Sequence, residues 1–430
     1  MKKNSLVIFV IFLLYSMSVF SNINVSAKEV ISSFDNKITD GDESHIIEGV
    51  PYVAQNRYSC GFASFTMIIK YYGHNTCLEE VLFNSGIGYS LAYTRFFKIP
   101  GISLFAARVP TFGAYIAQNP FIIADLADLY DLHFNFRACI PPSKQLPEDE
   151  RWDKYWLKVK NYIINDIPVI PSLDPLTLPY YREKFNITDN ETHGGHAVVL
   201  VGFNETNGTV CYNDPGPGLW NDSINGTYVY TPIEIFKNAV RNTAGYNLIY
   251  IIENHSNSPP LSKEERFKTA HEKNIQRMKG YFGAYFGFQI PITFPYFGIK
   301  GLYNFKRDLQ MGIFRRAFTV IKYSNFEGRD LYRLNQSFSF FSFEKHDMSQ
   351  FLFENEDLSS VCKYDAILLQ KESECWKNMS QLALQLNELG KNNGFLKMLI
   401  LSKSITDKMK KELDEIISIE EKIIAGPSEN

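Results

Sequence analysis

The chain has 430 residues, a formal net charge of −3, and a composition that is 45% hydrophobic and 15% aromatic. This length exceeds the roughly 150 residues of an average domain, so we expect more than one domain. The hydrophobic content predicts a folded protein and excludes a largely disordered one. Because the charge is nearly balanced, the composition gives no sign of a nucleic-acid-binding surface, and we expect no nucleic-acid partner.

Residues 1–27 have the three regions of a secretory signal peptide. The basic stretch MKKNS precedes the apolar run LVIFVIFLLYSMSVF, and the small residues Val25, Ser26 and Ala27 form a cleavage site. We therefore expect a secreted or extracytoplasmic protein. A retained membrane anchor is the alternative, because the apolar run is only slightly shorter than the ~20 residues that span a bilayer. An uncleaved signal segment would then be the only membrane contact.

After a polar stretch at 28–47, which predicts a flexible lead-in, residues 48–253 predict an α+β domain with helices first and strands later. The expected elements are, in chain order, a strand at 50–55, a helix from about Gly61 to Gly73, a helix at 77–86, a helix and then a strand within 121–139, a helix within 151–166, a strand at 167–173, a loop at 178–186, strands at 196–204, 208–216 and 227–232, a helix at 233–240 and a strand at 246–253. The three strands separated by Asn/Gly turns predict an antiparallel meander.

A Ser/Pro-rich stretch at 254–265, NHSNSPPLSKEE, predicts a linker between two domains. The remainder, 266–430, predicts a mainly helical C-terminal domain. Its last two long stretches, 373–390 and 395–424, repeat apolar residues at helical spacing and carry charges on the opposite face.

Export would place the cysteines in an oxidising compartment, where pairing is possible. Six cysteines in so long a chain do not make a disulfide scaffold, and connectivity is not readable from them. They are Cys60, Cys77, Cys139, Cys211, Cys362 and Cys375. Exported chains can also be glycosylated at Asn-x-Ser/Thr, although an Asn-rich composition alone also produces such sites. These sites are Asn186, Asn190, Asn204, Asn207, Asn221, Asn225, Asn254, Asn335 and Asn378.

Cys60 lies where a helix is expected to begin, in the stretch QNRYSCGFASF. The N–H groups of a first helical turn lower the pKa of a thiol beside them, which makes it a better nucleophile. Gly61 allows close approach of the backbone. Gln55 could place its side-chain amide near the same point and form an oxyanion hole with the backbone N–H of Cys60.

A general base would come from HGGHAVVLVGF, where His196 begins a strand. Asp214 ends the neighbouring strand, and in an antiparallel pair the start of one strand lies beside the end of the next. Asp214 can therefore orient the imidazole of His196. Asn213 is the fallback orienter, although its side chain should face the other side of the strand. His193 is the alternative base, but it lies in the loop before the strand.

Each of these residues also has a structural interpretation. A single Cys before a helix is more often a core residue, a single His is more often structural, and Asp-Pro is more often a turn. The combination of Gln55, Cys60, His196 and Asp214 favours a catalytic triad with an oxyanion donor. The loop at 178–186 offers Tyr180, Tyr181 and Arg182 as substrate contacts or as packed residues.

Residues 48–240 resemble the papain-like cysteine peptidases of the bacteriocin-processing type, the double-glycine peptidases of cysteine peptidase family thirty-nine. The pattern is Gln, Cys-Gly opening a helix, His-Ala-Val-Val and Asp-Pro, at Gln55, Cys60, His196 and Asp214. This resemblance implies a papain-like α+β fold, thiol attack on an amide carbonyl, an acyl-enzyme intermediate and hydrolysis of a peptide or small amide substrate.

A looser resemblance covers nearly the whole chain after the signal segment. The stretch SCGFASFTMIIKYYGHNTCLEEVLFNSGIGYSLAY is similar to the N-terminal family named after the butirosin-biosynthesis acyltransferase, and the C-terminal part resembles the helical domain that often follows it. This resemblance implies acyl transfer from a thioester to an amine by the same triad. A catalytically inert binding module is the third possibility.

Metal and cofactor motifs do not occur in the sequence. We find no zinc-ligand spacing, phosphate-binding glycine loop or nucleotide fingerprint, and we expect no cofactor and no metal. The substrate, the oligomeric state and the role of the C-terminal helices are not readable from the sequence.

Overall fold

The computed structural model describes residues 43–57, 59–96, 111–113, 120–138, 146–187, 195–220, 226–244, 248–254, 260–281, 293–310, 329–392 and 395–427. The segment expected to be a signal peptide, 1–27, and most of the expected lead-in lie outside them. Contacts divide the chain into two compact units. The first, which we call the sheet unit, comprises 1–73 and 135–253, and the second, the helical unit, comprises 74–134 and 254–430.

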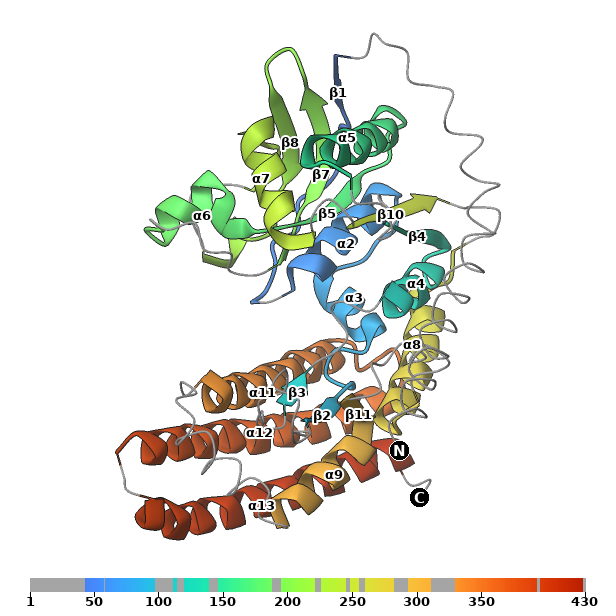
Figure 1. Ribbon diagram of the computed structural model, residues 1–430. Coiled ribbons are helices and arrows are strands. Elements are labelled where there is room, and N and C mark those ends of the chain that lie inside the picture. Colours follow the sequence, from blue (N-terminus) through green and yellow to red (C-terminus); the bar gives the residue numbers. More distant parts are fainter. Residues whose placement is uncertain are drawn as a thin grey trace, which may run out of the picture. The chain divides into compact units, whose positions relative to one another are not determined.

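The sheet unit is built on an antiparallel sheet whose strands follow the order β4-β10-β5-β7-β8-β9, with β1 paired to β7 and β6 to β5 (Figure 1). Its strands are β1 (Ser44–Ile46), β4 (Leu132–Ala138, which begins in the other unit), β5 (Val169–Leu173), β6 (His196–Ala197), β7 (Val199–Asn204), β8 (Thr209–Asn213), β9 (Val229–Pro232) and β10 (Leu248–Asn254). Its α-helices are α2 (Cys60–Tyr71), α5 (Glu148–Ile164), α6 (Pro179–Lys184) and α7 (Ile233–Ala244). The predicted meander is present as β7-β8-β9.

The structure corrects the end of the predicted lead-in, because residues 44–46 form strand β1. This strand pairs with β7 in the register Ser44↔Asn204 to Ile46↔Gly202. Strand β5 pairs with β7 at Leu200, so the backbone of β7 after Leu200 is available to pair with β1. The close approach depends on Gly202, because a Cβ at this position would lie 2.8 Å from the His45 carbonyl oxygen.

Two further sequence predictions are wrong in the sheet unit. The segment 50–55 forms no strand, and its backbone bonds instead to residues around the end of β8. The segment 178–186, expected as a loop, contains helix α6. Pro179 is the first residue of α6, a position where the missing N–H costs nothing and the fixed φ favours a helix.

The helical unit combines helices with a small three-stranded sheet of order β11-β2-β3. The strands are β2 (Ala92–Phe96), β3 (Thr111–Gly113) and β11 (Thr293–Phe297), and the helices are α3 (Leu78–Ser85), α4 (Pro120–Asp128), α8 (Lys263–Met278), α9 (Gly298–Gln310), α11 (Arg329–Glu354), α12 (Ser360–Asn392) and α13 (Phe395–Ala425). The predicted fold class, α+β with a mainly helical C-terminal region, is confirmed. Among the described helices, none combines the length and the apolar character needed to cross a bilayer.

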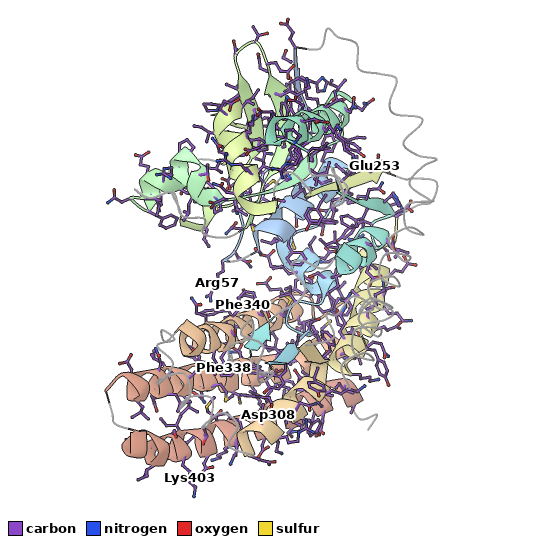
Figure 2. All side chains as sticks on the ribbon, viewed as in Figure 1. Arg57, Glu253, Asp308, Phe338, Phe340 and Lys403 are labelled. Atoms are coloured by element: carbon purple, nitrogen blue, oxygen red, sulfur yellow. The ribbon has the colours of Figure 1, made fainter. Side chains whose placement is uncertain are left out.

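The core of the helical unit is aromatic where α9, α11 and α12 meet. Phe338, labelled in Figure 2, is fully buried, and its ring lies 5.4 Å from that of Trp376 and 6.1 Å from that of Phe305. Asp308, also labelled, is buried and accepts a hydrogen bond of 2.7 Å from the Tyr93 hydroxyl on β2. The small sheet and the long helices therefore share one core.

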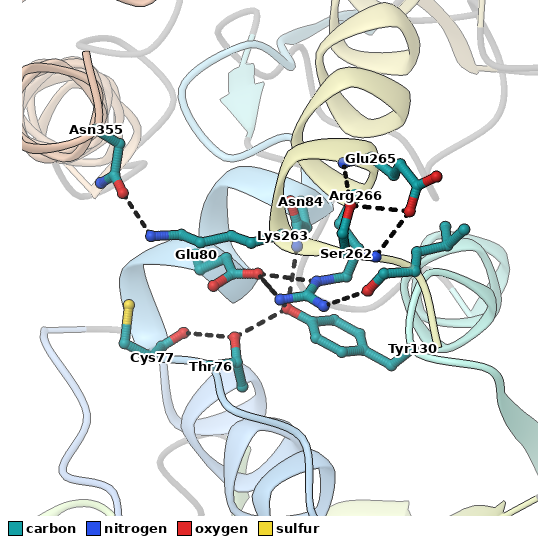
Figure 3. Close-up of polar contacts among 11 residues, drawn as sticks. Thr76, Cys77, Glu80, Asn84, Tyr130, Ser262, Lys263, Glu265, Arg266 and Asn355 are labelled. Carbon is teal, nitrogen blue, oxygen red and sulfur yellow. Dashed lines mark hydrogen bonds and ion pairs between the residues drawn. The ribbon is translucent and has the colours of Figure 1, made fainter. Parts of the chain in front are cut away.

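A buried polar network ties the segment 74–134 to α8 in the helical unit (Figure 3). Arg266 on α8 donates to one carboxylate oxygen of Glu80 on α3 through Nε at 3.0 Å and Nη2 at 2.7 Å. Its guanidinium also lies 4.8 Å from the centre of the Tyr130 ring. The contact units therefore differ from the predicted division at 48–253, 254–265 and 266–430, since 74–134 groups with the C-terminal residues and α8 begins inside the predicted linker.

The structure describes five of the six cysteines, and each of these five is a free thiol. Cys139 lies outside the described residues. Within the described part of the chain, no group of three or more His, Cys, Asp or Glu side chains is arranged to hold a metal ion.

Candidate active site

Cys60 is the first residue of α2 in the sheet unit. The residue before it, Ser59, does not cap the helix with its side chain and instead donates to the Asn56 carbonyl oxygen at 2.7 Å. The N–H groups of the first turn are therefore not occupied by a side-chain cap, and the backbone N–H of Gly61 contributes to lowering the pKa of the Cys60 thiol. This is the environment in which a helix N-terminus stabilises a thiolate.

His196 reaches Cys60 from strand β6. The paired strands place Leu173 opposite His196, and α2 packs against β6 and β7. One ring nitrogen of His196, Nε2, lies 2.8 Å from Oδ1 of Asp214, and the side chain also hydrogen-bonds the Cys60 thiol. Because Nε2 is directed at Asp214, the nitrogen directed at Cys60 is Nδ1. The structure thus brings together three of the four predicted site residues in the order thiol, imidazole, carboxylate.

The electrostatics of this arrangement favour a thiolate–imidazolium pair. Burial raises the pKa of the Cys60 thiol, but the hydrogen bond to His196, its charge, and the backbone N–H groups of Ala197 and Gly61 outweigh burial, so the pKa lies below its ordinary value. Burial lowers the pKa of His196, but the charge of Asp214 and hydrogen bonds to Asp214 and Cys60 raise it to about 10. Both shifts favour the charged form of the pair.

Asp214 is buried at the end of β8, with 3% of its surface exposed. Its Oδ1 accepts hydrogen bonds from the Gly216 backbone N–H at 2.9 Å and the Tyr181 hydroxyl at 2.9 Å, in addition to the contact with His196. Asn213, the alternative orienter, faces elsewhere as expected, since its side chain donates to the Val50 carbonyl oxygen and accepts from the Tyr228 backbone N–H. The alternative base His193 lies outside the described residues.

Gln55 occupies the segment before α2, and among the described residues no contact joins it directly to Cys60, His196 or Asp214. Its side-chain amide donates to the Arg57 carbonyl oxygen at 2.6 Å, which leaves one N–H of the amide for another acceptor. Its backbone N–H donates to the Pro215 carbonyl oxygen, directly after Asp214. Arg57, labelled in Figure 2, has a φ of 41°, which is strained for a residue with a side chain.

Tyr181 is the functional residue whose role the sequence did not indicate. It was expected to contact substrate or pack in a loop, yet it is 3% exposed and its hydroxyl lies between His196 and Asp214. Tyr180 lies beside it, with the two ring centres 4.9 Å apart. The one sequence feature that relates to this position of Tyr181 is the Gly directly after the Asp-Pro pair. Gly216 has no side chain and leaves the space that the Tyr181 hydroxyl fills.

The arrangement has the parts required for nucleophilic catalysis at a carbonyl. It contains a thiol with a lowered pKa, an imidazole within hydrogen-bond reach, and a buried carboxylate that orients the imidazole. The described residues that form it belong to the sheet unit.

Two comparisons with known proteins bear on this site. A search of the curated proteins finds no match to the chain. Residues 47–238 match the model of the Peptidase_C39 like family, a segment that contains Gln55, Cys60, His196 and Asp214 and ends inside α7. This match supports a papain-like C39 cysteine peptidase type for residues 47–238.

Proposed function

We propose that this protein is an exported cysteine peptidase or amidase that hydrolyses an amide bond through Cys60, His196 and Asp214. The observation that carries the proposal is the hydrogen-bonded series from the Cys60 thiol through His196 to the buried Asp214 carboxylate. The match to a cysteine peptidase family supports the same chemistry. Export rests on the signal-like sequence of residues 1–27.

In the proposed reaction, the Cys60 thiolate attacks the carbonyl carbon of the scissile amide. The carbonyl oxygen becomes an oxyanion, which the backbone N–H of Cys60 and the second amide N–H of Gln55 stabilise. His196 gives the proton on Nδ1 to the leaving amine, and a thioester remains on Cys60. His196 then removes a proton from water, the resulting hydroxide attacks the thioester, and the acid product leaves as the thiol re-forms.

Acyl transfer remains the second candidate, because the resemblance to the butirosin-type acyltransferases extends over the helical unit as well. The first half-reaction is then attack of Cys60 on a thioester donor, and an amine takes the place of water in the second. Acyl transfer requires that water be excluded from the acyl-enzyme, whereas hydrolysis requires that water reach it. An inert binding module, the third possibility, predicts an unreactive Cys60.

The test is selective alkylation of the full chain with iodoacetamide at neutral pH, with labelled sites identified by peptide mass spectrometry. Cys77 is an internal reference, because it is a free cysteine on an exposed residue, and partial burial of its sulfur and neighbouring glutamates raise its pKa. We expect Cys60 to react at least about ten times faster than Cys77, since thiolate is the reactive form. Equal rates at the two thiols would refute an activated nucleophile.

Activity is then measured with peptide amides and with a thioester plus amine acceptors. Cys60→Ala should lower turnover on the order of a thousandfold or more. Release of acid without new amide would support the peptidase or amidase, and new amide would support the acyltransferase. Full turnover by Cys60→Ala would refute both.

A further inference from the structure

Tyr181 lies beside the triad but belongs to a different element from any of its members. Helix α6 carries it, while Cys60 begins α2, His196 begins β6 and Asp214 follows β8. Its hydroxyl oxygen lies 2.9 Å from Oδ1 of Asp214 and 3.1 Å from Nε2 of His196. The ring of Tyr181 also meets the imidazole edge-on, with centres 5.5 Å apart.

The direction of these hydrogen bonds follows from the number of protons available. Asp214 as a carboxylate only accepts, so Nε2 of His196 at 2.8 Å must carry a hydrogen. The single hydroxyl proton of Tyr181 is donated to Asp214, and its lone pair then faces the Nε2–H of His196. Burial, together with the charge of Asp214, raises the pKa of Tyr181 far above its ordinary value, so the hydroxyl keeps its proton.

This orientation stabilises charge on both partners at once. The positive end of the hydroxyl dipole is directed at the carboxylate, and its negative end is directed at the imidazolium. It also requires the Nε2–H tautomer of His196, which leaves Nδ1 as the base toward Cys60. Removal of the hydroxyl withdraws one acceptor from the imidazolium and one donor from the carboxylate, so the charged pair loses stability relative to the neutral thiol and imidazole.

The chain leaves room for this hydroxyl. A Cβ on Gly216 would lie 1.9 Å from the Tyr181 hydroxyl oxygen, which is not sterically possible without displacement of the side chain. The backbone N–H of Gly216 donates to the same Oδ1 atom of Asp214 at 2.9 Å. Gly216 therefore both admits Tyr181 and binds the carboxylate that Tyr181 contacts.

We propose that Tyr181 is a positioning residue of the active site, which holds the imidazole of His196 between Asp214 and Cys60 and stabilises the thiolate–imidazolium pair. This inference rests on the proposed function. It assigns to Tyr181 no contact with substrate and no proton transfer to it. Its effect on the reaction is exerted through His196.

The experiment is the pH dependence of Cys60 alkylation by iodoacetamide in the full chain, which needs no substrate. Tyr181→Phe keeps the ring and removes the hydroxyl. We expect its profile to move to higher pH by about half a unit to one unit, which is a three- to tenfold lower rate on the rising limb. The limiting rate at high pH should stay unchanged, because the thiol itself is intact.

Two companion variants separate positioning from a general loss of packing. Tyr212→Phe also removes a buried hydroxyl from the sheet unit, but the partner of that hydroxyl is Thr231, so the alkylation profile should remain that of the wild type. Gly216→Ala keeps Tyr181 but displaces its hydroxyl, so its profile should shift in the same direction as that of Tyr181→Phe. Adding Tyr181→Phe to Gly216→Ala should produce little further shift, because the contact is already lost.

The outcomes distinguish this inference from the proposed function. If wild-type Cys60 is activated and Tyr181→Phe leaves its profile unchanged, the positioning role is refuted while the proposed function stands. An equal shift in Tyr212→Phe also refutes it, since the effect would then be general. If wild-type Cys60 reacts like Cys77, the proposed function fails and the inference fails with it.

Discussion

The buried ion pair between Glu80 and Arg266 holds the segment 74–134 to α8 in the helical unit. We expect its loss to lower the free energy of unfolding of that unit. Both side chains are buried, with 5% and 6% of their surfaces exposed, and two guanidinium nitrogens share one carboxylate oxygen. Arg266→Met leaves the buried carboxylate with the Tyr130 hydroxyl, at 3.3 Å, as its remaining donor among the described residues. Loss of one partner from a buried pair should lower the free energy of unfolding by about 3–5 kcal/mol.

Two further variants test whether this cost arises from the uncompensated charge. Glu80→Leu with Arg266→Met removes both charges, so the double variant should be more stable than Arg266→Met alone. Glu150→Gln breaks an exposed ion pair between Glu150 and Lys154. Their side chains are 47% and 49% exposed, and Lys154 Nζ lies 2.9 Å from Glu150 Oε1. That change should cost about 0.5 kcal/mol or less, because water screens the interaction.

The assay is urea-induced unfolding of the full chain followed by far-UV circular dichroism, with hydrogen exchange measured on α3. Exchange is needed because two units need not unfold in one step, whereas the amides of α3 report the helical unit directly. Faster exchange in α3 together with unchanged exchange in β7 and β8 is expected for Arg266→Met. If Arg266→Met costs no more than Glu150→Gln, the pair does not anchor the segment and the reasoning is refuted.

Two pH-dependent predictions concern other titratable groups. Since the pKa of Cys60 is lowered and that of His196 is raised to about 10, the alkylation rate of Cys60 should rise below the ordinary thiol range and change again only near pH 10. His196→Ala should move the first rise to higher pH, because only the backbone N–H groups of Ala197 and Gly61 then oppose the effect of burial on the Cys60 pKa; an unmoved rise would contradict this. Burial raises the pKa of Glu420 to about 8 in spite of its ion pair with Lys345, so the bound proton stabilises the fold at acidic pH and this stabilisation is lost as pH rises through about 8. In urea titrations, Glu420→Gln should therefore reduce the fall in unfolding free energy between about pH 5 and pH 8, and an unchanged slope would contradict it.

Local periodicity was sufficient for most elements of the sheet unit. Helix α2 begins at Cys60 and ends at Tyr71, close to the predicted stop at Gly73, because the apolar residues of this segment repeat at helical spacing. Helix α5 and strand β5 follow each other as predicted, since an amphipathic pattern gives way to a short apolar run. Alternation and Asn/Gly turns also predicted the meander formed by β7, β8 and β9.

Long-range pairing was not readable in the same way. Strand β1 forms because residues 202–204 of β7 offer backbone groups to it, which nothing in residues 44–46 reveals. The grouping of 74–134 with the C-terminal helices depends on buried partners such as Arg266, 186 positions after Glu80. Sequence periodicity predicts which face of an element is buried but does not specify the element that covers it.

The geometry of the site shows the same limit at the scale of single residues. Residue types and strand order predicted that His196 and Asp214 could meet, because both lie at ends of strands that run antiparallel. Tyr181 comes from a helix that was expected as a loop, so neither its burial nor its direction could be deduced. Its position depends on the space above Gly216, which is a property of the folded chain alone.

The segment before Cys60 shows why the mistaken strand at 50–55 matters for the chemistry. Its backbone is held by the loop that carries Asp214: the Asn213 side chain donates to the Val50 carbonyl oxygen at 3.1 Å, and the Gln55 backbone N–H donates to the Pro215 carbonyl oxygen at 3.0 Å. A strand would have turned alternate side chains away from this loop and satisfied its backbone elsewhere. As an irregular segment, it instead fixes the approach to the nucleophile from the same loop that fixes the carboxylate. These two hydrogen bonds therefore join the segment before the nucleophile to the residues around Asp214, so we expect a displacement of one to disturb the other.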